Sequence, residues 1–131
     1  MSKAAKQKGR LGQNEIRDKL LETFPELEPD DIKGCVMGDT GADIQLSPAA
    51  RKMLPLSIEV KRRKTGLQTA YNYMEQASSH NKGEPVLCYR SDRKPWLVMV
   101  GLDHYAQLLR SWNVNKSVGN TRRTSRHKRS R

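Results

Sequence analysis

The residues with the clearest chemical potential are two carboxylates and an amine in short segments rich in β-formers. Asp43 stands in Ala-Asp-Ile-Gln-Leu, and Glu59 and Lys61 stand in Ile-Glu-Val-Lys after a gap of fifteen residues. Because side chains alternate along a strand, Glu59 and Lys61 share one face, while Ile58 and Val60 take the other face, toward the core. A carboxylate and an ammonium side by side between apolar residues are unusual for a packing role.

The same residues could form a metal-dependent site for phosphodiester hydrolysis. If the two strands pair, Asp43 meets Glu59 at one edge, and two close carboxylates repel each other unless a cation lies between them. Hard oxygen ligands suit Mg²⁺ or Mn²⁺, and an ion so held can activate water for attack on phosphorus. Lys61 would position that water or offset the charge on the phosphoryl oxygens. The alternative is an ordinary surface ion pair, because Glu-x-Lys alone is common.

A second acid competes with Asp43 for the metal role. Asp39 lies in the Gly-Asp-Thr-Gly turn just before it. We favour Asp43 because Ile44 and Leu46 give its strand a face toward the core.

These residues require a sheet with helices packed on it. The apolar spacing of Ile16, Leu20 and Phe24 predicts a helix that Pro25 ends. In full, the sequence predicts helices at 12–24, 67–81 and 103–112, and strands at 32–37, 42–46, 56–61, 85–90 and 96–101, with 47–55 as a longer connection. The order α-β-β-β-α-β-β-α predicts a single α/β domain, with a central mixed β-sheet flanked by helices.

The net charge of +11 lies at the two ends of the chain. Residues 1–10 hold four basic residues and no acid, residues 116–131 hold seven and no acid, and the middle balances at fourteen of each. Basic ends of this kind attract polyanions, and nucleic acid is the usual partner. We therefore expect a disordered basic arm at 1–9, a folded domain at 10–112 and a disordered basic tail at 113–131.

At this point the sequence resembles a known superfamily. Asp43, the fifteen-residue gap and Glu59-x-Lys61, after an N-terminal helix, are similar to the PD-(D/E)XK nucleases, and in particular to their archaeal-type and phage-type Holliday junction resolvases. Those resolvases begin with a basic-Gly-x-x-Glu pattern, which reads Arg10-Leu-Gly-Gln-Asn-Glu15 here. The resemblance covers roughly residues 8–110. It implies a restriction-endonuclease-like fold.

The resemblance also implies roles for individual residues. Glu15, Asp43 and Glu59 would form the acidic, metal-binding cluster, and Lys61 would be the catalytic lysine. Glu15 is equally consistent with an exposed ion pair to Lys19, four residues later.

Other residues are secondary to this cluster. Gln76, on the predicted helix after the lysine strand, is a candidate because many superfamily members carry a glutamine there, although here it faces away from the apolar stripe. Asp39 stays a second candidate, and Ala42 stands where the superfamily name has proline. The DNA-binding candidates are Lys8, Arg10, Arg62, Arg63 and Lys64.

Together these observations predict an Mg²⁺-dependent endodeoxyribonuclease, with Mn²⁺ as a substitute, that resolves four-way DNA junctions. Two symmetric nicks require a two-fold homodimer. The alternatives are a nuclease of the same type that acts on nicked, flap or duplex DNA, and a non-catalytic basic module that binds nucleic acid. The sequence has no long apolar run, which would predict a membrane span. It also has no apolar N-terminal stretch, which would predict a secretory signal. The expected location is the cytoplasm of a prokaryotic cell or of a phage-infected host.

Overall fold

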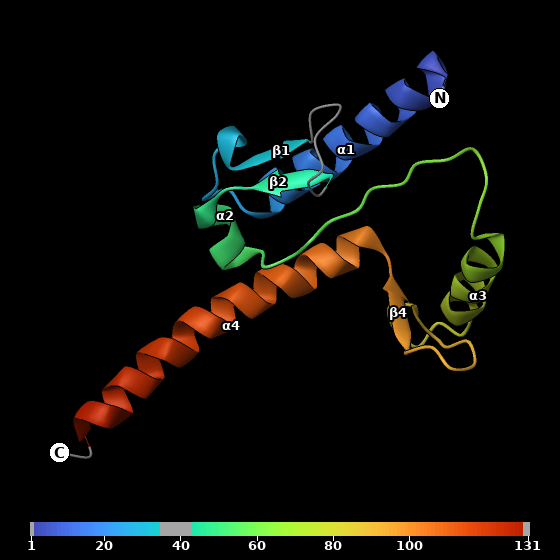
Figure 1. Ribbon diagram of the computed structural model, residues 1–131. Helices are drawn as coiled ribbons and strands as arrows, with labels where there is room; N and C mark the ends of the chain where they lie inside the picture. The colour runs from blue at the N-terminus through green and yellow to red at the C-terminus, as the bar shows by residue number, and fades with distance from the viewer. Residues whose placement is uncertain (1, 35–42, 130–131) are drawn as a thin grey trace. The chain divides into compact units, whose positions relative to one another are not determined.

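The computed structural model describes residues 2–34 and 43–129, with side chains up to residue 116. The chain divides into two compact units: unit 1 comprises Met1–Arg62 and Ala106–Arg131, and unit 2 comprises Arg63–Tyr105. Figure 1 shows the elements, which in chain order are α1 (Lys3–Thr23), η1 (Pro29–Asp31), β1 (Ile32–Gly34), β2 (Ile44–Leu46), α2 (Pro48–Met53), α3 (Gln68–Ser79), β3 (Val86–Tyr89), β4 (Leu97–Val100) and α4 (Leu102–Arg129).

Unit 1 is organised around α1 and a short hairpin. The Ser2 hydroxyl accepts a hydrogen bond from the Ala5 N–H and caps the start of α1. The helix ends at Thr23 with Phe24 as its C-cap, immediately before Pro25, which cannot continue it. β1 and β2 pair antiparallel, with Ile32 opposite Leu46, and Figure 1 shows this hairpin lying beside α1.

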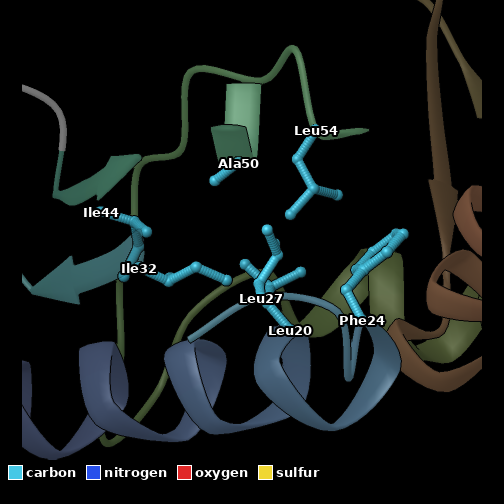
Figure 2. Packing of buried hydrophobic residues seen from close by; sticks show 7 residues of the cluster. All are labelled: Leu20, Phe24, Leu27, Ile32, Ile44, Ala50 and Leu54. Carbon is cyan, nitrogen blue, oxygen red and sulfur yellow. The ribbon is translucent and has the colours of Figure 1, made fainter. Parts of the chain in front are cut away.

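The core of unit 1 lies between α1, the hairpin and α2. Figure 2 shows the buried side chains, which are Leu20, Phe24, Leu27, Ile32, Ile44, Ala50 and Leu54. Phe24, Ile32 and Leu54 are the largest of the fully buried side chains. Ile16 packs against this cluster from the preceding turn of α1, so the apolar stripe predicted at every fourth residue is confirmed.

Two polar contacts fasten the periphery of this core. The Ser47 hydroxyl donates a 2.6 Å hydrogen bond to Asp31 and also caps α2 by accepting from the Ala50 N–H. The Ser47 hydrogen bond lowers the pKa of the Asp31 carboxyl. On α4, Arg110 binds Glu26 with an N–O distance of 2.6 Å, and this hydrogen bond lowers the pKa of Glu26. The two carboxylates are therefore stabilised in their charged form.

Unit 2 consists of α3 and an antiparallel hairpin. β3 and β4 pair with Val86 opposite Val100 and Tyr89 opposite Leu97. None of the residues 63–105 falls in the buried class, and Leu97 and Val98 are each 66% exposed although they point to opposite faces of β4. Strands that are apolar on both faces are typical of the inside of a sheet.

The prediction of a central mixed β-sheet flanked by helices is wrong. The described residues form two separate two-stranded antiparallel sheets, β1-β2 and β3-β4, in a largely helical chain. The predicted third strand, residues 56–61, is not assigned as a strand. Part of the reason is chemical, because the Val60 N–H donates to the Asp43 carboxylate rather than to a backbone carbonyl, as a ladder would require.

The backbone is described at both ends of the chain, up to residue 129. Residues 3–9 form the first part of α1, and α4 runs on to Arg129. Neither stretch contains proline, the residue that most strongly disrupts a helix interior. The limits 10–112 for a nuclease domain stay a prediction. Among the described helices, none is long and apolar enough to cross a membrane.

Candidate functional site

Asp43 is joined to the segment that carries Glu59 by two hydrogen bonds. The Asp43 N–H donates to the Ile58 carbonyl oxygen at 3.1 Å, and the Val60 N–H donates to Asp43 Oδ2 at 2.6 Å. The two contacts fall on the residues immediately before and after Glu59. Asp43, which directly precedes β2, is therefore held beside Glu59, although residues 56–61 form no strand.

The segment around Glu59 alternates between the core and solvent. Ile58 and Val60 pack against the buried cluster, whereas Glu59 and Lys61 are exposed. Lys61 Nζ lies 3.0 Å from Glu59 Oε1, with both side chains more than 60% exposed. The predicted alternation is confirmed, and the ammonium and the carboxylate form the ion pair that their spacing allows.

Glu15 reaches the same segment from α1. Its Oε1 lies 3.2 Å from a guanidinium nitrogen of Arg62. One turn earlier on α1, Gly12 is buried, and a Cβ at that position would lie 3.1 Å from the Arg62 Cβ and 3.4 Å from Val60 Cγ1. The helix can approach the segment this closely because residue 12 carries no side chain.

The four residues predicted to be catalytic, Glu15, Asp43, Glu59 and Lys61, thus all belong to unit 1 and lie on elements that contact one another. Sequence reasoning missed the Arg62–Glu15 pair, because it assigned Arg62 to DNA phosphates alone. The signal that could have found it is Gly12, whose missing side chain marks the place where α1 meets another segment.

The three carboxylates do not gather into a metal site. Glu15 pairs with Arg62, Glu59 pairs with Lys61, and Asp43 accepts from a backbone N–H. Within residues 2–34 and 43–129, no group of three His, Cys, Asp or Glu side chains could hold a metal ion. The arrangement can bind phosphate oxygens through its cations, but it does not itself present the donor set for Mg²⁺.

The remaining predicted residues belong to both units. Arg10 is exposed and Lys8 half-buried on α1 in unit 1, whereas Arg63 and Lys64 are exposed in unit 2. Gln76 is exposed on α3, also in unit 2. Asp39 lies outside the described residues, and its competition with Asp43 stays open.

Comparison with known proteins adds no assignment. No family model, curated protein or solved structure matches the chain.

Proposed function

We propose that the chain is a DNA endonuclease of the PD-(D/E)XK type that resolves four-way junctions as a homodimer. The observation that carries the proposal is the pair of hydrogen bonds from Asp43 to the residues on either side of Glu59. They join two acidic segments, chosen from sequence alone, beside the lysine that the resemblance makes catalytic. The proposed location is the cytoplasm of a prokaryotic or phage-infected cell, where such DNA is found.

In this proposal the cations of the site bind the DNA backbone. Lys61 and Arg62 are each about half exposed or more and can donate to phosphate oxygens. An ammonium at the scissile phosphate would stabilise charge that develops on its oxygens, which is the role that the resemblance gives to Lys61. Lys8 and Arg10 on α1, with Arg63 and Lys64 in unit 2, would contact phosphates and add affinity without reading sequence.

The cofactor proposed from the resemblance is Mg²⁺, with Mn²⁺ as a substitute. Oxygen ligands from Glu15, Asp43 and Glu59 are the kind that these ions take. Since the described carboxylates are not gathered, the requirement for the ion is itself part of what must be tested.

A second candidate is a non-catalytic module that binds nucleic acid. This candidate is favoured because each of the three carboxylates binds a different partner, a cation or a backbone N–H. Such a contact can be purely structural. This candidate predicts salt-dependent binding without any product in Mg²⁺ or Mn²⁺.

The deciding experiment is cleavage of an end-labelled four-way DNA junction in Mg²⁺, run beside linear duplex and flap DNA and repeated in EDTA. Glu59→Gln removes the proposed charge, and Glu22→Gln, an exposed glutamate of α1, is the matched control. We expect paired symmetric nicks in the junction alone, lost in EDTA and in Glu59→Gln but retained in the control. Cleavage of all the DNAs without preference for the junction would support a nuclease of the same type with another substrate. Binding without any cleavage product would support the second candidate, the non-catalytic module.

A further inference from the structure

An apolar hollow of about 640 Å³ lies between α3 and the β3-β4 hairpin of unit 2. Ten residues line this hollow, all of them belong to unit 2, and none of them is charged. Leu67 and Tyr73 line it from the side of α3, and Leu87, Leu97 and Met99 line it from the strands. A single unit therefore builds the whole site.

The walls of the hollow are open to solvent. Leu67, at the start of α3, is 71% exposed, and Leu97 and Val98 of β4 are both 66% exposed. Contiguous exposed apolar patches mark interaction sites. An isolated two-stranded hairpin is also only marginally stable until other elements cover its apolar side chains. Both arguments indicate that the hollow has an occupant.

Trp96 lies next to the hollow in the chain but does not line it. It directly precedes Leu97, which does line the hollow, and its own side chain is 64% exposed. An exposed indole beside an apolar hollow makes a surface self-complementary. A two-fold axis between the two features would place the Trp96 of each copy in the hollow of the other copy.

Composition and charge favour a second copy over DNA as the occupant. The hollow has no charged residue and contains Tyr73, Tyr89 and Met99, and the cores of protein–protein interfaces are likewise rich in aromatic residues and methionine and poor in charge. It offers no cation to a phosphate. Because the chain carries a net charge of +11, two copies repel each other in general, and an uncharged surface lets them meet.

The exposed apolar area is sufficient for a specific contact. The large apolar side chains of this surface are Leu67, Tyr73, Tyr89, Trp96, Leu97 and Val98, which are between 40% and 71% exposed. If each side chain offers on the order of 150 Å² in full, they present roughly 500 Å² per copy. Two copies together reach the roughly 1,000 Å² that a specific interface buries.

We propose that two copies of this chain associate through the hollow of unit 2, with Trp96 of each copy inserted into the hollow of the other. The proposal rests on the proposed function for the homodimer, whose interface it names, and it involves no step of the cleavage reaction. The dimer is closed, because each copy contributes one Trp96 and one hollow, and both are used.

Sedimentation equilibrium of the full-length protein tests the interface. We expect a reversible dimer, and Trp96→Ala should raise its dissociation constant by more than about 100-fold, because two central tryptophans are lost from each dimer. Trp112→Ala is the matched control, since Trp112 is a 44% exposed tryptophan of α4 in unit 1, and it should change the constant only a few-fold. Higher salt should strengthen the dimer by screening the repulsion between copies, whereas it weakens DNA binding.

The fluorescence of Trp96 is a second readout, and it decides the question even if Trp96→Ala does not fold. The chain has two tryptophans, so Trp112→Phe leaves Trp96 as the sole indole. Its emission should shift to shorter wavelength, and its quenching by acrylamide should fall, as protein concentration rises through the dissociation constant. Shielding at every concentration would show that the chain covers its own hollow, and shielding only on addition of DNA would make DNA the occupant. Either result, or no shielding at all, would overturn the proposal.

These results are distinguishable from those that test the proposed function. A dimer that Trp96→Ala dissociates, in a protein that cuts no DNA in Mg²⁺ or Mn²⁺, would support the interface and overturn the nuclease. A junction-cleaving dimer that persists in Trp96→Ala would overturn the interface and support the nuclease. A wild-type protein that stays monomeric at all concentrations would overturn both the interface and the homodimer.

Discussion

Replacing Asp43 separates its structural contact from its proposed chemistry. The Asp43 carboxylate accepts a 2.6 Å, partly buried hydrogen bond from the Val60 N–H. A hydrogen bond to a charged group contributes about 1.5–3 kcal/mol, and a neutral one about 0.5–1.5 kcal/mol. Asp43→Ala should therefore destabilise the protein by roughly 2 kcal/mol. Asp43→Asn, which keeps an oxygen acceptor in the same place, should cost about 1 kcal/mol.

Urea unfolding followed by circular dichroism measures these losses. With a slope of about 2 kcal/mol per molar, Asp43→Ala should lower the midpoint by roughly 1 M, and Asp43→Asn by about half of that. Asp18→Ala is the control, because Asp18 is exposed on α1 and pairs with the adjacent Arg17 on the same helix. Both Asp43 variants should bind the junction, and neither should cut it.

The unfolding midpoint tests the structural contact of Asp43, and junction cleavage tests its catalytic role. If Asp43→Ala unfolds at the wild-type midpoint, the carboxylate does not hold Val60, and the geometry that carries the proposed function is wrong. If Asp43→Asn is stable and cuts junctions at the wild-type rate, the contact is real but Asp43 has no catalytic role. Asp39 would then become the acid to test.

Three further outcomes are expected. Leu54→Ala, at a fully buried position, should lower the free energy of unfolding by about 2–5 kcal/mol in a urea titration. The hydrogen bond from Ser47 lowers the folded-state pKa of Asp31, so the stability that this contact contributes is present above the unfolded pKa and is lost as pH falls through the folded pKa. Ser47→Ala should therefore lower the free energy of unfolding more at pH 7 than at pH 2. An equal loss at both pH values would contradict the contact. Lys8→Gln with Arg10→Gln should reduce the slope of log affinity for DNA against log salt by about 2, measured by fluorescence anisotropy.

Local periodicity predicted which side chains face the core in two parts of the chain. The stripe of Ile16, Leu20 and Phe24 does face the core, and the alternation from Ile58 to Lys61 separates core from solvent as expected. These features depend on neighbours within one helix or strand, so the sequence contains all the information they require.

Contacts between distant segments were harder to predict. Pairing of the third strand failed because the Asp43 side chain takes the Val60 N–H, a competition between side chain and backbone that hydrophobic patterns do not encode. Asp43 nevertheless lies beside Glu59, because its N–H and its carboxylate bind the backbone of Ile58 and Val60. The Arg62–Glu15 pair was not predicted, because three successive cations, Arg62 to Lys64, could each pair with Glu15. The packing of Gly12 against Arg62 determines which of them does.

The distribution of charge suggests how binding and chemistry are divided in the proposed nuclease. At the candidate site the carboxylates of Glu15 and Glu59 are each matched by a cation, Lys61 for Glu59 and Arg62 for Glu15, whereas Asp43 accepts from a backbone N–H. The positive excess lies in residues 1–10 and 116–131, away from these pairs in sequence. Charge removed from the ends should therefore change affinity and its salt dependence, whereas charge removed from the pairs should change the rate at saturation.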